Sequence, residues 1–245
     1  MSGITGSLRL RALRWNRMRR LVKRLAALFL VPLFQWYLRR ERVFRYNDIR
    51  IRVMPGVFHP GFFFSTRFLL QYLTDIDLSN KRFLELGSGT GLISIFAARR
   101  GSMVTASDLS TKAVGNTKTN AALNNTVIET VFSDLFTALT GKFDIIVVNP
   151  PYYAKPVTRE SELAWHSGED HLYFKKFFGQ LGAHIHDQSQ VIMVLTKGCD
   201  MHRIFEIARQ TGFEMDLLRE RNVFFDEKDF LYGIRPVNSF VSTQV

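Results

Sequence analysis

Short, continuous apolar runs alternate along most of the chain with longer segments whose apolar residues recur at helical spacing. Such runs are typical of strands buried on both faces of a parallel sheet, and the segments between them are typical of amphipathic helices. The alternation therefore predicts an α/β fold. The predicted strands cover residues 81–86, 103–108, 127–132, 143–148 and 190–196, with a closing pair at 223–225 and 230–236; the predicted helices cover residues 92–100, 110–124, 171–185 and 201–211.

The segment before the first of these strands contains weaker signals. Residues 49–53 alternate apolar and charged side chains, which predicts a short strand, and residues 54–56 read as a turn. Apolar residues at helical spacing over 67–73 predict a helix, with Ser65 or Thr66 as its N-cap.

Charge divides the chain into two parts. The first 50 residues hold 13 of the 33 basic residues and two of the 22 acidic ones, which accounts for the net charge of +11. The remaining 195 residues carry 20 charges of each sign. We therefore predict a basic, amphipathic helical arm over residues 1–50 and a domain over residues 51–245.

Three roles are open for this arm. It is suited to lying on an anionic membrane surface, to binding RNA phosphates, or to capping the domain with its apolar face. Its apolar run, residues 25–38, contains Pro32 and is 14 residues long. A membrane-spanning helix needs about 20 apolar residues, so none is predicted. A secretory signal is disfavoured because no small-residue cleavage site follows the run.

Cysteine and histidine usage argues against a metal centre. Cys199 is the only cysteine, so an internal disulfide and a cysteine-cage metal site are both excluded. Six histidines show neither an HExxH motif nor paired metal-ligand spacing. We expect no bound metal and a reducing, cytoplasmic environment, with membrane association through the arm as an option.

A glycine-rich turn joins the strand at 81–86 to the following helix. Its sequence, Gly87-Ser88-Gly89-Thr90-Gly91, is neither the dinucleotide fingerprint GxGxxG nor a phosphate loop with Gly-Lys-Ser/Thr. Glycines allow positive φ and close approach of a ligand to the backbone. Asp108 ends the next strand, where an acid accepts hydrogen bonds from ribose hydroxyls, and Asp134 ends the third strand, within reach of an adenine amino group.

The fourth predicted strand ends in Asn149-Pro150-Pro151-Tyr152. Two prolines stop the strand and leave Asn149 at the carboxyl end of the sheet. The Asn149 carboxamide oxygen and the Pro150 carbonyl can accept N–H bonds from a planar amide or amino group, and Tyr152 can cover its face. The alternative is a plain proline-rich turn. Residues 154–170 form either a substrate lid or a long connection.

With these motifs in order, residues 53–236 resemble the class I S-adenosylmethionine-dependent methyltransferases that carry an (Asp/Asn)-Pro-Pro-(Tyr/Phe) motif. The resemblance implies a Rossmann-like, seven-stranded, mostly parallel sheet with helices on both faces, preceded here by the basic arm. It also implies a site: the methionine part of the cofactor lies on Glu85, Gly87, Gly89 and Gly91, the ribose on Asp108, the adenine beside Asp134 and Leu135, and the acceptor nitrogen against Asn149, Pro150 and Tyr152.

Two segments, one before the glycine turn and one after Tyr152, point to a subgroup of this family. Residues 58–66 and 167–172 are most similar to glutamine N5-methyltransferases that act on release factors, although the arginine-rich arm replaces their helical substrate domain and Trp165-His166-Ser167 departs from their loop. A protein glutamine is therefore the first acceptor to consider, and an RNA base (adenine N6 or guanine N2), favoured by the arm, is the second. A cofactor-binding protein without turnover is a third reading, against which the intact Asn149 and glycine turn argue.

Overall fold

A computed structural model describes residues 39–61, 64–151, 169–223 and 227–237. The chain divides into two compact units, Met1–Glu41 and Arg42–Val245, and the second is described here. Most of the predicted basic arm lies outside the described residues, so the arm stays a prediction.

One sheet of seven strands organises the second unit, in the order β5-β4-β3-β6-β7-β9-β8. The first five strands in this order run parallel, whereas β9 is antiparallel to both β7 and β8. The predicted seven-stranded, mostly parallel sheet is confirmed. The strands are β3 (Arg82–Leu86), β4 (Met103–Asp108), β5 (Ile128–Phe132), β6 (Ile145–Val148), β7 (Gln190–Thr196), β8 (Phe213–Val223) and β9 (Glu227–Pro236).

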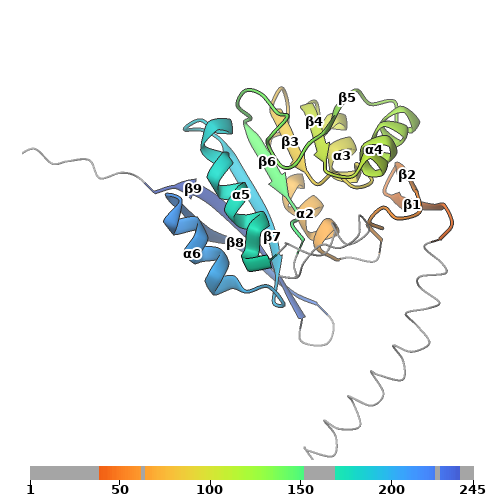
Figure 1. Ribbon diagram of the computed structural model, residues 1–245. Helices are drawn as coiled ribbons and strands as arrows, with labels where there is room; N and C mark the ends of the chain where they lie inside the picture. Colours follow the sequence, from red (N-terminus) through yellow and green to blue (C-terminus); the bar gives the residue numbers. More distant parts are fainter. Residues whose placement is uncertain (1–38, 62–63, 152–168, 224–226, 238–245) are drawn as a thin grey trace, which may run out of the picture. The chain divides into compact units, whose positions relative to one another are not determined.

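Helices cover both faces of the sheet, as predicted (Figure 1). Side chains alternate between the faces along each strand. Thus Leu84 packs in a cluster with α5 and α6, while Phe83 packs in a separate cluster with α2 and α3. The helices are α2 (Phe64–Thr74), α3 (Leu92–Arg99), α4 (Thr111–Leu123), α5 (Leu172–Leu181) and α6 (Met201–Gln210).

Two local predictions were wrong. Strand β8 covers Phe213–Val223 rather than 223–225. It pairs only with β9 and exposes most of its residues, so it lacks the apolar alternation that marks a buried strand. Helix α2 begins at Phe64, so Ser65 and Thr66 lie buried inside its first turn instead of capping it.

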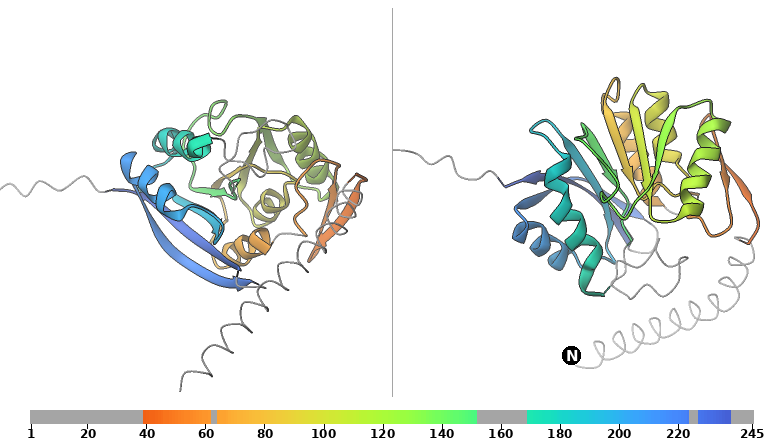
Figure 2. Two further views of the ribbon diagram at one scale, coloured as in Figure 1. Left: turned by 60° about the horizontal axis from the view of Figure 1, so that its bottom comes forward. Right: turned by 45° about the horizontal axis from the view of Figure 1, so that its top comes forward.

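A separate two-stranded hairpin precedes the sheet. It consists of β1 (Arg42–Tyr46) and β2 (Ile49–Val53), so the predicted strand at 49–53 is confirmed and pairs with residues that the sequence assigned to the arm. Figure 2 shows this hairpin, in orange, beside α4. Ile49, Ile51 and Val53 are buried against α2 and α3.

Three buried asparagines, spaced four residues apart along α4 and its C-cap, bind the open edge of β2. We call Asn116, Asn120 and Asn124 the asparagine ladder. Their side-chain amides pair with the backbone as a neighbouring strand would, which satisfies the polar groups of both partners. The bonds are Arg50 N–H to Asn124 Oδ1 (3.0 Å), Asn124 Nδ2 to Arg50 O (2.7 Å), Arg52 N–H to Asn120 Oδ1 (2.8 Å), Asn120 Nδ2 to Arg52 O (2.8 Å), Met54 N–H to Asn116 Oδ1 (3.0 Å) and Asn116 Nδ2 to Arg52 O (2.8 Å).

The asparagine ladder predicts a large stability effect. Asn120→Ala leaves the Arg52 N–H without its buried partner, so we expect the free energy of unfolding to fall by about 3 kcal/mol. Lys118→Ala, on the exposed face of the same helix, is the matched control and should change it by less than about 0.5 kcal/mol. Urea unfolding measures both. Equal effects would contradict a stabilising role for the ladder.

Candidate active site

Sheet register brings the predicted site residues together. Leu86, at the end of β3, is the register partner of Ser107 on β4 and of Val148 on β6. The next residues along the three strands are Gly87, Asp108 and Asn149. They therefore lie side by side at the carboxyl edge of the sheet, where open α/β folds bind ligands.

The glycine turn needs its glycines for two different reasons. Gly87, Gly89 and Gly91 all have positive φ, from 53° to 76°. At Gly87 an added Cβ would meet no atom within 4 Å, so the turn borders open space there. At Gly91 an added Cβ would lie 2.7 Å from Cγ2 of Thr117, so close packing against α4 also excludes a side chain. The turn thus presents bare backbone on one side and packs tightly on the other.

Helix α4 supports the turn through the same face that carries the asparagine ladder. Asn120 Nδ2 donates to the carbonyl of Thr90 at 2.9 Å, and Thr117 Oγ1 lies 3.0 Å from Ser88 Oγ. Asn120 also binds the hairpin backbone at Arg52. One buried side chain therefore connects the hairpin to the glycine turn. The sequence analysis did not identify this face.

Asp108 ends β4, as predicted, and contacts the glycine turn. Its Oδ2 accepts the Gly89 N–H at 2.9 Å, and its Oδ1 accepts the Ser110 N–H at 2.9 Å. The side chain is only half-buried, yet desolvation of its carboxyl raises the pKa of Asp108 despite these bonds. Asp108 thus joins the glycine turn to the start of α4 and adds a negative charge beside it.

Glu85 lies beneath the glycine turn. Its Oε2 accepts bonds from the backbone N–H of Ser94 at 2.8 Å and from Ser94 Oγ at 2.5 Å, both in α3. Burial, with a smaller contribution from the nearby Asp108 charge, raises the pKa of Glu85 to about 8. The structure therefore ties Glu85 to the first turns of α3. Contact between Glu85 and a cofactor stays a prediction.

Strand β5 is followed by a bent segment that contains Asp134 and Leu135. Leu135 is buried with a φ of 53°, a conformation that costs a non-glycine residue energy and recurs at functional sites. Ser133 Oγ donates to the Leu135 carbonyl at 2.8 Å and stabilises the bend. Asp134 Oδ2 accepts a bond from Lys176 Nζ at 2.5 Å. The acid predicted to reach an adenine amino group is therefore already an ion-pair partner.

Helix α5 contributes site residues that the sequence analysis missed. Lys176 pairs with Asp134, and Gln180 Oε1 accepts the Phe136 N–H at 3.2 Å, so α5 is fixed against the bent segment. One turn earlier, burial raises the pKa of the half-buried Tyr173, and the charges of Asp108 and Asp134 raise it further. The Tyr173 hydroxyl thus lies within electrostatic reach of both acids. The sequence analysis predicted a helix over residues 171–185 and assigned it no role in the site.

Asn149 is held by a residue of helix α2. Its Nδ2 donates to Oγ of Ser65 at 3.3 Å, which turns Oδ1 to the other side of the carboxamide. Pro150 and Pro151 are buried behind it. Tyr152 and most of the predicted 154–170 loop lie outside the described residues, so their roles stay predictions.

The segment from the hairpin to α2 passes over the site. A Cβ added at Gly89 would lie 3.8 Å from Cβ of Phe58, and Ser65 contacts Asn149. Between them, His59 is buried, and its Nδ1 accepts the Gly61 N–H at 3.1 Å. Burial lowers the pKa of His59, which favours the neutral ring. This segment therefore borders both the glycine turn and Asn149.

Two negative findings concern the part of the chain that the structure describes. Within it, no three His, Cys, Asp or Glu residues are grouped closely enough to hold a metal ion. Among the same residues, no helix combines the length and apolar character needed to cross a membrane.

Comparison with known proteins identifies relatives of this domain. The family model for the methyltransferase small domain matches residues 48–206. A Methanocaldococcus jannaschii protein, provisionally named a protein N5-glutamine methyltransferase, is 43% identical over 107 residues, which are 43% of this chain and 52% of that protein. A release factor glutamine methyltransferase of Lactococcus lactis is 37% identical over 120 residues, 48% of this chain and 44% of the relative.

An RNA-directed relative matches a similar stretch. The ribosomal RNA small subunit methyltransferase C of Citrobacter koseri is 33% identical over 113 residues, 45% of this chain and 32% of the relative. The matched segments thus span between 32% and 52% of the length of these curated relatives.

Solved structures share the fold at low sequence identity. A T. Thermophilus 16S rRNA N2 G1207 methyltransferase in complex with AdoMet and guanosine has a TM-score of 0.58 at 19% identity, covering 80% of this chain and 50% of that one. The E. cuniculi Mtq2-Trm112 complex, described as responsible for methylation of the termination factor eRF1, has a TM-score of 0.55 at 19% identity, covering 73% and 98%. These likenesses confirm the Rossmann-like architecture.

The raised pKa of Glu85 predicts a pH-dependent stability. Between pH 4.5 and about 8 the folded protein retains a Glu85 proton that the unfolded chain has lost. The free energy of unfolding should therefore fall as pH rises through this window, by up to about 1.4 kcal/mol per pH unit. Glu85→Gln should flatten this fall in urea unfolding from pH 5 to 9, whereas Asp187→Asn, at an exposed carboxyl, should keep it. An unchanged profile in Glu85→Gln would contradict the assignment.

Proposed function

Because this chain belongs to the methyltransferase small domain family, we propose that it is an S-adenosylmethionine-dependent N-methyltransferase acting on a planar amide or amino nitrogen. The observation that carries the proposal is the register of β3, β4 and β6, which sets the glycine turn, Asp108 and Asn149 side by side. A protein that only binds the cofactor would need the glycine turn and Asp108 but not Asn149. Asn149, oriented by Ser65, adds a group suited to an acceptor nitrogen.

The site fits the charge and shape of this cofactor. S-adenosylmethionine carries a positive sulfonium and a positive ammonium group. Burial disfavours the ionised carboxylates of Glu85 and Asp108, and a cation beside them would compensate that cost. Open space at Gly87 leaves room for a ligand against the backbone. Gly87, Gly89 and Gly91 would hold the methionine part, Asp108 the ribose, and the segment of Asp134 and Leu135 the adenine.

The cofactor, when bound, supplies a methyl group already activated on sulfur. An amide or aromatic amino nitrogen is a poor nucleophile because its lone pair is delocalised. Asn149 Oδ1 and the Pro150 carbonyl would accept its N–H bonds and align that lone pair, while Tyr152 would cover the planar face. The gain is mainly one of orientation, which in well-positioned reactants is worth several kcal/mol.

We place a protein glutamine first among acceptors. Relatives named as glutamine methyltransferases support it, at 43% and 37% identity over the matched segments. An RNA base, adenine N6 or guanine N2, is the second candidate. The basic charge of residues 1–50 favours it, and a relative named as a ribosomal RNA methyltransferase matches the same domain.

The proposed environment follows from the acceptor and from Cys199. Both acceptor classes are macromolecules of translation, and the buried, free Cys199 thiol suits a reducing compartment. We therefore propose a cytoplasmic location. Contact between the basic arm and an anionic membrane stays a prediction.

Asp108 should control the pH dependence of cofactor binding. A protonated carboxyl is a poorer acceptor for ribose hydroxyls, and the raised pKa of Asp108 moves its protonation to higher pH than usual. Cofactor affinity should therefore weaken on acidification, beginning above the ordinary range of an aspartate. Asp108→Asn should bind at least tenfold more weakly with a flatter pH profile. Calorimetric titration from pH 5 to 8 measures both, and wild-type affinity in Asp108→Asn would remove this residue from the site.

Substitutions of Asn149 and Ser65 should slow methyl transfer while leaving cofactor affinity nearly unchanged. We expect Asn149→Ala to lower single-turnover methyl transfer at least 100-fold, because its interaction matters most in the transition state. Ser65→Ala removes one orienting hydrogen bond and should cost about tenfold. Cofactor affinity should stay within about threefold of wild type in both. A wild-type rate of methyl transfer in Asn149→Ala would contradict a role of Asn149 in holding the acceptor nitrogen. A loss of cofactor affinity as large as the loss of transfer rate would instead assign Asn149 to cofactor binding.

A further inference from the structure

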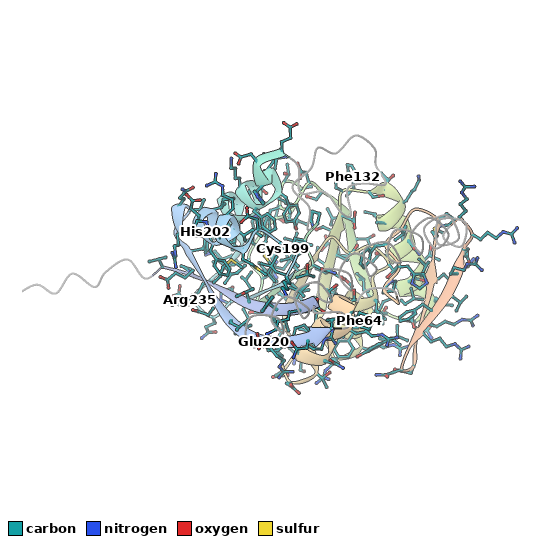
Figure 3. All side chains as sticks on the ribbon, turned by 90° about the horizontal axis from the view of Figure 1, so that it is seen from below. Phe64, Phe132, Cys199, His202, Glu220 and Arg235 are labelled. Atoms are coloured by element: carbon teal, nitrogen blue, oxygen red, sulfur yellow. The ribbon has the colours of Figure 1, made fainter. Side chains whose placement is uncertain are left out.

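The β1–β2 hairpin separates its side chains sharply by face. On β2 the three aliphatic residues are buried, whereas Arg50 and Arg52 between them are exposed. On β1, Val43 and Arg45 are exposed on the same side, since they are the register partners of Arg52 and Arg50. We call Arg45, Arg50 and Arg52 the arginine face. Figure 3 shows nitrogen-tipped side chains projecting from the hairpin, which is drawn in pale orange.

The arginine face places Arg45 and Arg50 side by side on the exposed side of the hairpin. Arg45 is directly opposite Arg50 across the two strands, an arrangement in which like charges repel. The only acid within residues 42–53 is Asp48, which pairs with Arg99 on α3, and the exposed Glu41 directly precedes β1. Within the described part of the chain, neither Arg45 nor Arg50 has an ion pair. Such an arrangement is unfavourable for the hairpin alone.

The asparagine ladder fixes the backbone of the arginine face. Asn124 binds the N–H and carbonyl of Arg50, and Asn120 binds those of Arg52. These bonds use only the backbone of Arg50 and Arg52, and the two residues are exposed. The backbone positions of the charges are therefore set before any ligand binds, and that preorganisation lowers the entropy cost of binding.

We propose that the arginine face binds the phosphate backbone of RNA. Guanidinium groups match phosphate oxygens with paired hydrogen bonds, and several on one rigid surface favour a polyanion over a single acid. Of the three residues before the hairpin, Arg39 and Arg40 are basic and Glu41 is acidic, so the net charge there is also positive. Insertion into a lipid surface requires a broad apolar face, and here Val43 is the only apolar residue among the arginines. RNA is therefore the partner that this charge arrangement fits best.

This inference does not rest on the proposed methyl transfer. RNA binding is measured without cofactor and without turnover, so failure of either proposal leaves the other intact. The arginine face fixes the position of a phosphate backbone, and it carries no base specificity.

The test compares two double variants of the full chain that remove equal charge. Arg45→Gln with Arg50→Gln neutralises the arginine face. Arg219→Gln with Arg235→Gln neutralises two exposed arginines of β8 and β9 that are paired with carboxylates. Binding to fluorescent single-stranded poly-uridine is measured by anisotropy from 50 to 250 mM KCl, and thermal unfolding confirms that both variants fold.

We expect the arginine-face variant to bind about tenfold more weakly at 50 mM KCl and the control within about twofold of wild type. Its slope of log affinity against log salt should be shallower by about 1.4, which corresponds to two lost phosphate contacts. Equal losses in both variants, or no loss in either, would overturn the proposal. So would a loss confined to anionic vesicles or to poly-glutamate, which would assign the face to a membrane or to an acidic protein.

Discussion

The buried polar face of α4 is the interaction on which the rest of the described structure depends. Asn120 alone binds the hairpin backbone at Arg52 and the glycine turn at Thr90. A hydrogen bond contributes only about 0.5–1.5 kcal/mol to the free energy of unfolding, but a buried amide left without partners costs about 1–3 kcal/mol. Losing one of these asparagines is therefore expected to destabilise the fold by more than the bond itself contributes. The face therefore sets one arrangement of hairpin and glycine turn, and its hydrogen bonds act together with the apolar packing of Ile49, Ile51 and Val53.

From this arrangement the site follows by geometry and electrostatics. Parallel strands end at one edge, so residues far apart in sequence, such as Gly87 and Asn149, become neighbours. The acids there are kept from full solvation, and the raised pKa values of Glu85 and Asp108 express that cost. A positively charged ligand relieves it. The same charges would disfavour an anionic ligand at this position, although phosphate-binding folds use similar glycine turns.

Much of this could be predicted from the sequence, for identifiable reasons. The strand at Gln190–Thr196 has the predicted bounds, because a continuous apolar run indicates a strand buried on both faces. The strand at Met103–Asp108 also has the predicted bounds, although its sequence is mixed. Asn149 could be placed because it directly follows the apolar run of β6, and Asp108 because it ends β4. The bounds of the charged edge strand β8 could not be predicted, because this strand is held by pairing with β9 and not by a buried apolar face.

The asparagine ladder escaped prediction for a different reason. Asparagines four residues apart on a helix read as a solvated stripe, and nothing local reveals partners 62 to 74 residues away. The α5 contacts were hidden in the same way, since Lys176 meets Asp134 only after folding. Long-range polar pairing leaves no periodic signal. It is also what turns a generic sheet edge into this particular site.

The central claim is that the chain transfers a methyl group to a nitrogen of an acceptor molecule that is held against Asn149. The most direct measurement is mass spectrometry of macromolecules from cells that lack the protein, after incubation with it and isotopically labelled S-adenosylmethionine. The account predicts label on a side-chain amide or exocyclic amino nitrogen, present with wild-type protein and missing with Asn149→Ala. Label on oxygen, sulfur or carbon, or label that persists with Asn149→Ala, would contradict it.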